Sequence, residues 1–507
     1  MTKIKVDKMK FFEFKNYYVL YLVIIIFFTV SFLQFDNYLS PGFEILIFLL
    51  IFLFGAFSIY YYTQNEDNLH KVAFVIILLF GITCVFLTPI ADVSDELEHF
   101  TRSEIVSTGQ ISTNYVQIPN TTEYGYLTIK SVDDFRQNIN LNVFSTKIDD
   151  NKIDYTPLYF SSAFAQNPFY SYLPQGLGIF LAKILDLNAI WMLWLGRLFN
   201  LLFYAGIISL AIKKAPVLKF PLLIVSILPL AIYQAASLSV DGMFSSLAIL
   251  AFAYFLYFYK TPKIEWKDLG IFYLAIILSG LLKTPFLALS LLIFLVPNEH
   301  FTSKRQNIIS KLGILLTLCI GIAWSSYATS VLENSWRGDA FASNHVNAKE
   351  QMTYLISHPV FSLERLSDTI SEFPVIVDRF FYFSNAAGQY FSSLMSILYM
   401  LFFTLFSLIY PLDEKFDLKT RIKVFAIGIL IYLSVIGVQY LTWASVGAES
   451  VMAGVFSRYF IPLLIFIPLL INKDLIEFDI EKLALITLTI AIGFISGMIM
   501  LTVSVKY

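Results

Sequence analysis

The chain has 507 residues, of which 57% are hydrophobic and only 14% are charged, whereas a soluble domain has about 45–50% apolar and about 25% charged residues. Aromatic residues make up 17% of the chain, and the mean hydropathy is +0.70. A soluble core cannot bury this excess, so the composition predicts an integral membrane protein. The net charge of −2 excludes the global positive field that is typical of nucleic-acid-binding proteins.

A helix that crosses the hydrocarbon core of a bilayer, roughly 30 Å thick, needs about 20 apolar residues. The apolar segments predict an all-α polytopic membrane protein with about 13 transmembrane helices. A proline at position 285 separates the seventh segment from the eighth, because proline removes a backbone donor and favours a break. The segments lie near residues 17–34, 42–61, 71–90, 188–212, 218–235, 241–259, 267–282, 285–297, 310–331, 389–411, 421–443, 457–472 and 482–504.

Lysine and arginine accumulate in short cytoplasmic loops, which orients the predicted helices. With a cytoplasmic N-terminus, the short outer loops and the C-terminus hold only Lys283, Arg458 and Lys506. The same arrangement places two long polar stretches, residues 91–187 and 332–388, outside the cell membrane. We therefore expect one membrane domain, residues 1–507, whose two long outer loops carry helices that lie in the membrane interface.

The richest polar segment, residues 91–102, follows the third predicted helix. If it is helical, Asp95, His99 and Arg102 share one face, because they are spaced at i, i+4 and i+7. Such a carboxylate can accept a proton from a sugar hydroxyl, and such a guanidinium can hold a phosphate. The alternative is a solvated helix that Asp92 or Ser94 caps, with Asp95 and Glu96 complementing its dipole and Glu98 paired with Arg102.

The predicted topology places three more charged residues at the outer side of the membrane, level with residues 91–102. Asp241 begins the sixth helix, Lys283 lies at the break before Pro285, and Arg458 begins the twelfth helix. Ionisable residues at membrane depth are costly and usually face a cavity or the protein interior, so each is a candidate site residue. Snorkelling to the headgroups is the alternative for Lys283. Arg197, one turn before Asn200, lies deeper and is expected to join helices by hydrogen bonds.

Known cofactor motifs do not occur in the sequence. There is no nucleotide-binding, zinc-protease or serine-hydrolase signature, and Gly176 and Gly178 lack the third glycine of a dinucleotide fingerprint. The five histidines have no metal-ligand spacing. Cys84 and Cys319 fall in apolar runs and show no zinc or disulfide pattern. Whether a metal takes part stays unknown at this level.

Several motifs occur along the chain in a fixed order. Together they resemble the bacterial membrane family called domain of unknown function 2142, which is related to the GT-C-fold glycosyltransferases. The resemblance covers roughly residues 75–465. The motifs are Asp95-Glu96-x-x-His99-x-x-Arg102, Tyr172-Leu173-Pro174-Gln175-Gly176-Leu177-Gly178, Gly196-Arg197-Leu198-Phe199-Asn200, the run from Pro229 through Gln234 to Asp241, the run from Gln351 to Pro359, and the run from Gly454 through Arg458-Tyr459 to Pro462.

The resemblance implies a GT-C-like fold and an enzyme whose first outer loop, residues 91–187, is catalytic. Its donor would be a sugar linked to a polyprenyl phosphate such as undecaprenyl phosphate, and its acceptor a cell-wall polysaccharide or teichoic acid. We expect Asp95 to be the general base, with Glu96 as the second candidate. The predicted contacts to the donor phosphate are Arg102, Arg458, His99 and Lys283, and the further predicted substrate contacts are Asp241, Tyr172, Gln234 and Tyr459.

Three points stay open from the sequence. A divalent cation bridging carboxylate and phosphate is the alternative to one of the protein's own cations. A transporter or a flippase for lipid-linked sugars is the alternative to an enzyme, although such proteins usually show paired broken helices with charges near the midplane. A non-catalytic scaffold for wall-polymer assembly is the third class. The partners expected in every case are the bilayer and a glycan or lipid-linked sugar, without nucleic acid.

Overall fold

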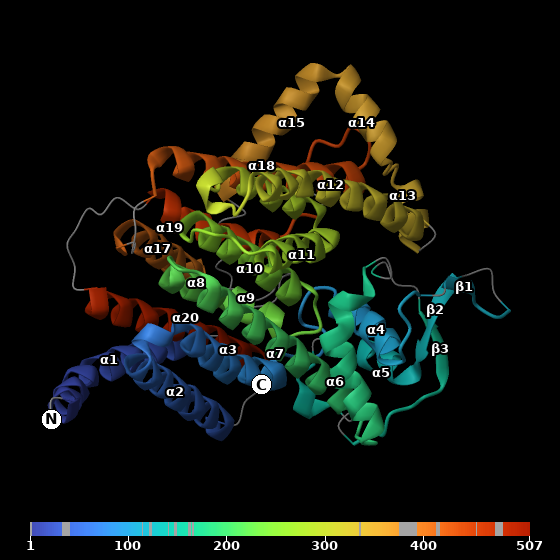
Figure 1. Cartoon of the computed structure of the whole chain (residues 1–507). Coiled ribbons are helices and arrows are strands. Elements are labelled where there is room, and N and C mark those ends of the chain that lie inside the picture. The colour runs from blue at the N-terminus through green and yellow to red at the C-terminus, as the bar shows by residue number, and fades with distance from the viewer. Residues whose placement is uncertain are drawn as a thin grey trace.

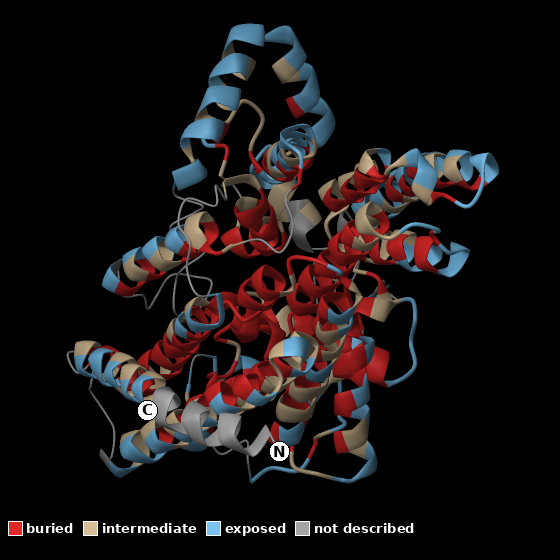
Figure 2. Ribbon diagram, turned by 60° about the vertical axis from the view of Figure 1, so that its left-hand side comes forward, coloured by how far each residue is buried: buried red, intermediate tan, exposed pale blue. Residues whose placement is uncertain are grey.

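The computed structural model describes most of the chain as helix. It covers residues 3–32, 41–113, 115–120, 124–139, 141–146, 150–160, 164, 167–333, 336–374, 393–411, 416–452, 454–471 and 480–507. Long helices lie side by side as a bundle, and the elements of the first polar stretch gather at one end of it (Figure 1). One large apolar core runs through the bundle, from Tyr21 to Tyr507 (Figure 2).

Eight helices in the described ranges are long and apolar enough to cross a bilayer. A multi-pass helical membrane protein is therefore confirmed. The helices that contain these spans are α1 (Lys3–Phe32), α2 (Pro41–Gln64), α3 (Leu69–Leu87, with the short η2, Glu66–Asn68, before it), α7 (Ile190–Lys214), α10 (Asp241–Lys260), α12 (Lys304–Glu333), α18 (Leu418–Trp443) and α20 (Ile480–Lys506).

The predicted count of thirteen spans is not confirmed, because five of the predicted segments form shorter helices. Proline is a recurrent cause: the ring fixes φ and removes a donor, so helices begin or break there. The shorter elements are α8 (Lys219–Ser226) and α9 (Pro229–Ala235), α11 (Trp266–Leu282), η7 (Thr284–Leu295), α17 (Ser393–Ile409), and η9 (Ser457–Ile465) with α19 (Phe466–Ile471). The first residues of the predicted segment 389–411 lie outside the described ranges.

The first polar stretch contains α4 (Glu96–Ser107), α5 (Lys130–Arg136), η6 (Phe169–Tyr172) and α6 (Leu173–Ile184). It also contains an antiparallel sheet that the sequence analysis does not predict. The strands are β1 (Tyr115–Gln117), β2 (Tyr124–Ile129) and β3 (Pro157–Phe160), in the order β1-β2-β3. In the register of the sheet, Leu127 faces Tyr159 and Val116 faces Gly125.

The two glycines of the Gly176-Leu177-Gly178 motif have a packing role in α6. A Cβ atom on Gly178 would lie 2.2 Å from the carbonyl oxygen of Leu195 in α7, and one on Gly176 would lie 3.3 Å from that of Ser103 in α4. Only glycine permits approaches this close to another backbone. The motif thus lets α6 lie tightly between α4 and α7, which holds α4 at the end of the bundle.

The second polar stretch forms α13 (Trp336–Ser343), α14 (Ala348–Ser357) and α15 (Pro359–Ser371). Helices α14 and α15 make a hairpin that projects from the bundle beside α18 (Figure 1). Apolar side chains on the hairpin are exposed, among them Ile356, Val360 and Leu363 at 67–75%. Residues 375–388 of the predicted loop lie outside the described ranges.

Candidate functional site

Four charged side chains from four separate elements meet at one place. Arg458 Nε donates to Asp241 Oδ2 at 2.6 Å, and Arg458 Nη2 donates to Asp95 Oδ2 at 3.3 Å. Lys283 Nζ lies 3.7 Å from Asp241 Oδ1. We call Asp95, Asp241, Lys283 and Arg458 the charged quartet. Its two carboxylates and two cations formally cancel, so it carries no net charge when all four are ionised.

The local backbone conformation orients each of these four side chains. Asp95 precedes α4 in a left-handed conformation, φ 64°, and its carboxylate makes no cap to that helix. Asp241 is the first residue of α10, where the helix dipole favours a negative charge. Lys283 lies in extended backbone between α11 and η7, before the proline that starts the new helix. Arg458 enters η9 just after Gly454, whose φ is 68°.

The members of the quartet differ in how firmly they are held. The side chains of Arg458 and Asp241 are 4% and 5% exposed, whereas that of Asp95 is 31% exposed. The bond from Arg458 to Asp95 is also the longer of its two carboxylate bonds. Arg458 Nη1 is buried and has no hydrogen-bond partner among the described residues. The guanidinium is therefore anchored by Asp241, contacts Asp95 more weakly, and keeps unused donor capacity at Nη1.

Aromatic rings surround the two cations. Lys283 Nζ lies 3.5 Å from the centroid of the Tyr459 ring, and the Arg458 guanidinium lies 4.2 Å from that of Phe456. The negative ring faces attract cations, and they do so more strongly where water is excluded. Tyr459 thus lies against both cations and helps to hold them.

His99 lies on α4 and belongs to a neighbouring hydrogen-bonded group. Its Nδ1 is 2.8 Å from the Tyr172 hydroxyl, which also accepts a hydrogen bond from Asn167 at 2.9 Å. The pKa of His99 is lowered to about 4, chiefly by burial; Asp95 and Asp241 act to raise it, and Arg458 and Lys283 act to lower it. The imidazole is therefore neutral at neutral pH.

Glu96 occupies a site entirely different from that of Asp95. Its two oxygens accept from Nε and Nη2 of Arg197 at 2.8 and 2.7 Å, and Oε1 also accepts from the backbone N–H of Leu238. Arg197 donates further to three backbone carbonyls at the end of α3, those of Val85, Thr88 and Pro89. The side chains are 1% and 0% exposed. This pair ties α4, α7 and the turn after α3 together, as expected for Arg197.

One protein family matches the chain over most of its length. The family described as a predicted membrane protein, DUF2142, matches residues 78–467. The chain belongs to this family. The matched range contains every member of the charged quartet and the Glu96–Arg197 pair. No curated protein and no solved structure matches the chain.

Two further predicted site residues of this DUF2142 chain, Arg102 and Gln234, are buried. Arg102 is buried and donates from Nη2 to the carbonyl of Ile111, with its guanidinium 5.9 Å from the Tyr172 ring centroid. Gln234 in α9 is 1% exposed, and its amide atoms have no hydrogen-bond partner among the described residues. Arg102 therefore does not join Arg458, although it lies on α4, which begins directly after Asp95.

The alternative of a solvated helix for residues 96–107 is wrong. Ten of the twelve residues of α4 are buried, Arg102 and Glu104 among them, and Asp95 makes no side-chain cap. The reason is tertiary: α4 is enclosed by α6, α5 and the sheet, which a single sequence segment does not reveal. Figure 2 shows the buried residues concentrated where the long helices pack, with exposed residues on the projecting hairpin.

Three further polar contacts, made by Asp92 and Glu104, were not predicted. Asp92 accepts from the Tyr233 hydroxyl at 2.5 Å. Glu104 binds Lys183 at 2.5 Å and accepts from the Thr128 hydroxyl at 2.6 Å, which fastens α4 to α6 and the sheet. The acidic residues between positions 92 and 104 indicate a segment rich in polar contacts. Their partners could not be predicted, because they come from segments that are remote in sequence.

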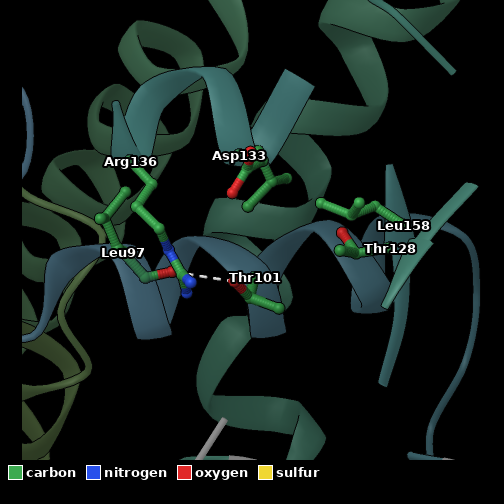
Figure 3. Close-up of a pocket in the computed structure, with 7 residues that line it drawn as sticks. Leu97, Thr101, Thr128, Asp133, Arg136 and Leu158 are labelled. Carbon is green, nitrogen blue, oxygen red and sulfur yellow. Dashed lines mark hydrogen bonds between the residues drawn. The ribbon is translucent and has the colours of Figure 1, made fainter. Parts of the chain in front are cut away.

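The described residues contain no metal-ligand cluster, and the hollow beside α4 does not coincide with the quartet. In the described ranges, no group of three or more His, Cys, Asp or Glu side chains could hold a metal ion. A hollow between α4, α5 and the sheet leaves no space for a water molecule and shares no residue with the quartet (Figure 3). Its lining is Leu97, Thr101, Thr128, Val132, Asp133, Arg136 and Leu158.

Proposed function

We propose that the chain is a glycosyltransferase of the bacterial cell membrane that uses a sugar linked to polyprenyl phosphate, such as undecaprenyl phosphate, as donor. The acceptor would be an extracytoplasmic glycan, a cell-wall polysaccharide or a teichoic acid. The observation that carries the proposal is the contact of Arg458 with both Asp95 and Asp241, beside Lys283. Two cations and a partly exposed carboxylate in one place supply an anion site and a base.

In the proposed reaction, the donor phosphate takes the place of Asp95 on Arg458. Asp95 is the member of the quartet that is most exposed and has the longer bond to Arg458, so it is the one that an incoming anion displaces most easily. Asp241 stays bound and keeps the guanidinium oriented. Release of Asp95 leaves the quartet with an uncompensated positive charge until the phosphate binds, which favours the monoanionic phosphodiester of the donor over a neutral headgroup.

The freed Asp95 carboxylate then accepts the proton of an acceptor hydroxyl. The hydroxyl oxygen forms a bond to the anomeric carbon, the bond from that carbon to the phosphate oxygen breaks, and the polyprenyl phosphate leaves with the electron pair. Phosphate is a good leaving group, so Arg458 and Lys283 stabilise its growing charge and no general acid is required. A single displacement of this kind inverts the anomeric centre.

Glu96 is the less suitable base in this proposal. Both its oxygens are engaged by Arg197 and Leu238, and the side chain is 1% exposed. Withdrawing it for proton transfer would leave the buried Arg197 charge without its carboxylate, which is costly. We therefore assign the base to Asp95 and the positioning of α4 to Glu96.

The finer topology is part of the same proposal. A cytoplasmic N-terminus, a GT-C-like arrangement of thirteen spans and an extracytoplasmic site would put the quartet at the outer leaflet, where the headgroup of a prenyl-linked donor lies. The exposed apolar residues of α15, Val360 and Leu363 among them, suit a helix in the membrane interface.

The test is sugar transfer by the purified protein in lipid nanodiscs. Glycan composition of a strain lacking the gene identifies the sugar, and the matching undecaprenyl-phosphate sugar is then the donor. Asp95→Asn should reduce turnover by about 10²–10⁴-fold, the usual contribution of a general base. The control Glu265→Gln changes an exposed acid, 59% accessible and paired with Lys267, and should leave turnover unchanged.

The same assay separates the other functions. Movement of the lipid-linked sugar across a proteoliposome membrane without transfer would replace the enzyme by a flippase. Full turnover in Asp95→Asn would remove the assigned base. Loss of turnover on adding EDTA, restored by Mg²⁺ or Mn²⁺, would add a divalent cation to the two side-chain cations.

A further inference from the structure

A pocket lies at the other end of α4, away from the charged quartet. It is formed where the C-terminal part of α4 and the following turn meet the sheet, and it has a volume of about 150 Å³. Every strand of the sheet contributes to it. Its lining residues are Ile105, Gln110, Val116, Tyr126, Leu127 and Tyr159.

The size of the pocket fits one six-membered ring. A cavity of about 150 Å³ is known to accept a molecule the size of benzene, whereas pockets for drug-sized ligands are about 300–1,000 Å³. A whole nucleotide or a lipid chain is therefore too large. The ligand that fits is a single ring, either alone or as one unit of a longer chain that continues outside the pocket.

The chemistry of the lining selects a neutral ring with both apolar and hydroxyl surface. No Asp, Glu, Lys, Arg or His lines the pocket, so it offers no charge to an anion or a cation. Aliphatic side chains and the rings of Tyr126 and Tyr159 offer apolar surface, and the Gln110 amide offers donors and an acceptor. A pyranose has this combination, because its C–H faces are apolar and its edges carry hydroxyls.

The pocket is rigidly connected to the quartet through α4. Asp95 precedes the first residue of α4, and Ile105 lies ten positions later, which is about 15 Å along a helix that rises about 1.5 Å per residue. Glu104, one position before Ile105, binds Lys183 of α6 and accepts from Thr128 of β2. These buried bonds fix α4 against the sheet, so the pocket and Asp95 keep a constant separation.

We propose that this pocket binds one neutral sugar residue of the glycan acceptor. That sugar would be separated from the reacting hydroxyl, at Asp95, by about 15 Å, which a short oligosaccharide spans. The claim that this sugar belongs to an acceptor rests on the proposed function. The claim that the pocket binds a saccharide is independent of that function, because it depends only on residues of the sheet, of α4 and of the turn after α4. The pocket would let the enzyme prefer a glycan chain over a single free sugar.

The experiment measures saccharide binding and uses no donor. Saturation-transfer NMR is applied to the detergent-solubilised protein with three neutral trisaccharides, built from glucose, mannose and N-acetylglucosamine. At least one should bind, with a Kd in the millimolar range that single-ring pockets give, about −4 kcal/mol. Gln110→Ala and Tyr159→Leu should each weaken that Kd at least fivefold.

Matched variants keep the result interpretable. Gln137→Ala removes another exposed amide, on the turn after α5, whose Nε2 donates to Asp133 Oδ2 at 3.1 Å; it should leave the Kd unchanged. Asp95→Asn should also leave it unchanged while abolishing transfer. Thermal unfolding of each variant shows whether it is folded.

Three outcomes overturn the proposal: none of the trisaccharides binds, binding survives in both Gln110→Ala and Tyr159→Leu, or Gln137→Ala weakens binding as much as they do. Transfer activity without pocket binding would reject the pocket and keep the enzyme. Pocket binding without transfer would keep the pocket and reject the enzyme.

Discussion

Asp95 and Glu96 are neighbours in sequence, yet the structure gives them opposite surroundings. The Glu96 carboxylate is closed into a fully buried pair with Arg197 and shares its oxygens with a backbone N–H. The Asp95 carboxylate is partly exposed and holds the outer side of Arg458 through one longer bond. Both are carboxylate–arginine contacts, but only the second leaves a carboxylate that solvent or a substrate reaches.

The difference arises at the start of α4. Asp95 lies in left-handed backbone before the helix, which an aspartate tolerates better than most residues. Glu96 is already helical and turns toward α7 and the end of α3. One residue thus separates a contact that stabilises the fold from one that is suited to chemistry, and the predictions below test that separation.

The largest effect on stability is expected for Glu96→Ala. Removing one partner of a buried ion pair leaves an uncompensated charge and costs about 3–5 kcal/mol. The free energy of unfolding in detergent, followed by circular dichroism, measures it. An apolar pair of similar volume is often tolerated, but methionine at position 197 leaves the carbonyls of Val85, Thr88 and Pro89 without their donor. The double variant Glu96→Met with Arg197→Met should therefore recover only part of the loss. Equal stability of Glu96→Ala and the wild type would contradict the anchoring role.

The next largest effect is expected for Arg458→Lys on donor use. Lysine keeps the charge but loses the planar fork that binds Asp241 and Asp95 at once. Loss of one charge-assisted hydrogen bond costs about 1.5–3 kcal/mol, which corresponds to about 10–150-fold in kcat/KM for the donor. Steady-state kinetics at varied donor concentration measures it. A change confined to the KM of the acceptor would contradict the assignment of Arg458 to the phosphate.

A smaller effect is expected for Asp241→Asn. Asparagine still accepts a hydrogen bond from Arg458 but no longer neutralises Arg458 and Lys283, so the guanidinium keeps its place less firmly. Turnover should fall by about tenfold, less than in Asp95→Asn, because Asp241 is a positioning residue and not the base. A larger loss in Asp241→Asn than in Asp95→Asn would reverse the two roles.

The last prediction concerns the dependence of stability on pH. His99 has a pKa of about 4 in the folded protein and about 6.5 when unfolded. Between these values the unfolded chain binds more protons, so stability is full above about pH 6.5 and falls by about 1.4 kcal/mol for each pH unit toward 4. Unfolding measured from pH 7 to pH 5 should show this dependence in the wild type. It should be reduced in His99→Gln, and an identical slope in both would exclude His99.

Much of the architecture follows from the apolar pattern. Hydropathy located helices at every predicted span, because lipid demands apolar residues and satisfied backbone groups. It did not give their lengths: α8 and α9 divide at a proline, and η7 forms 12 residues of tight helix. The three-stranded sheet was missed because its short strands carry little alternation and are fixed by contact with α4.

Part of the candidate site could be predicted from the sequence, because charged residues in membrane segments are rare. Charges at membrane ends are costly, so Asp241, Lys283 and Arg458 stood out without a structure. The sequence could not show that Asp95 and Glu96 separate, since one position of helix phase decides which partner each meets. It also could not find Lys183 or Tyr233, because a single lysine or tyrosine has no spacing that marks a remote partner.

The most direct test of the central claim is the affinity of undecaprenyl phosphate for the wild type and for Arg458→Met, measured in nanodiscs with the exposed-site variant Glu265→Gln as a control. The account predicts at least tenfold weaker binding in Arg458→Met, because one desolvated cation is lost, and unchanged binding in the control. Equal affinities of the wild type and Arg458→Met would contradict an anion site at the charged quartet.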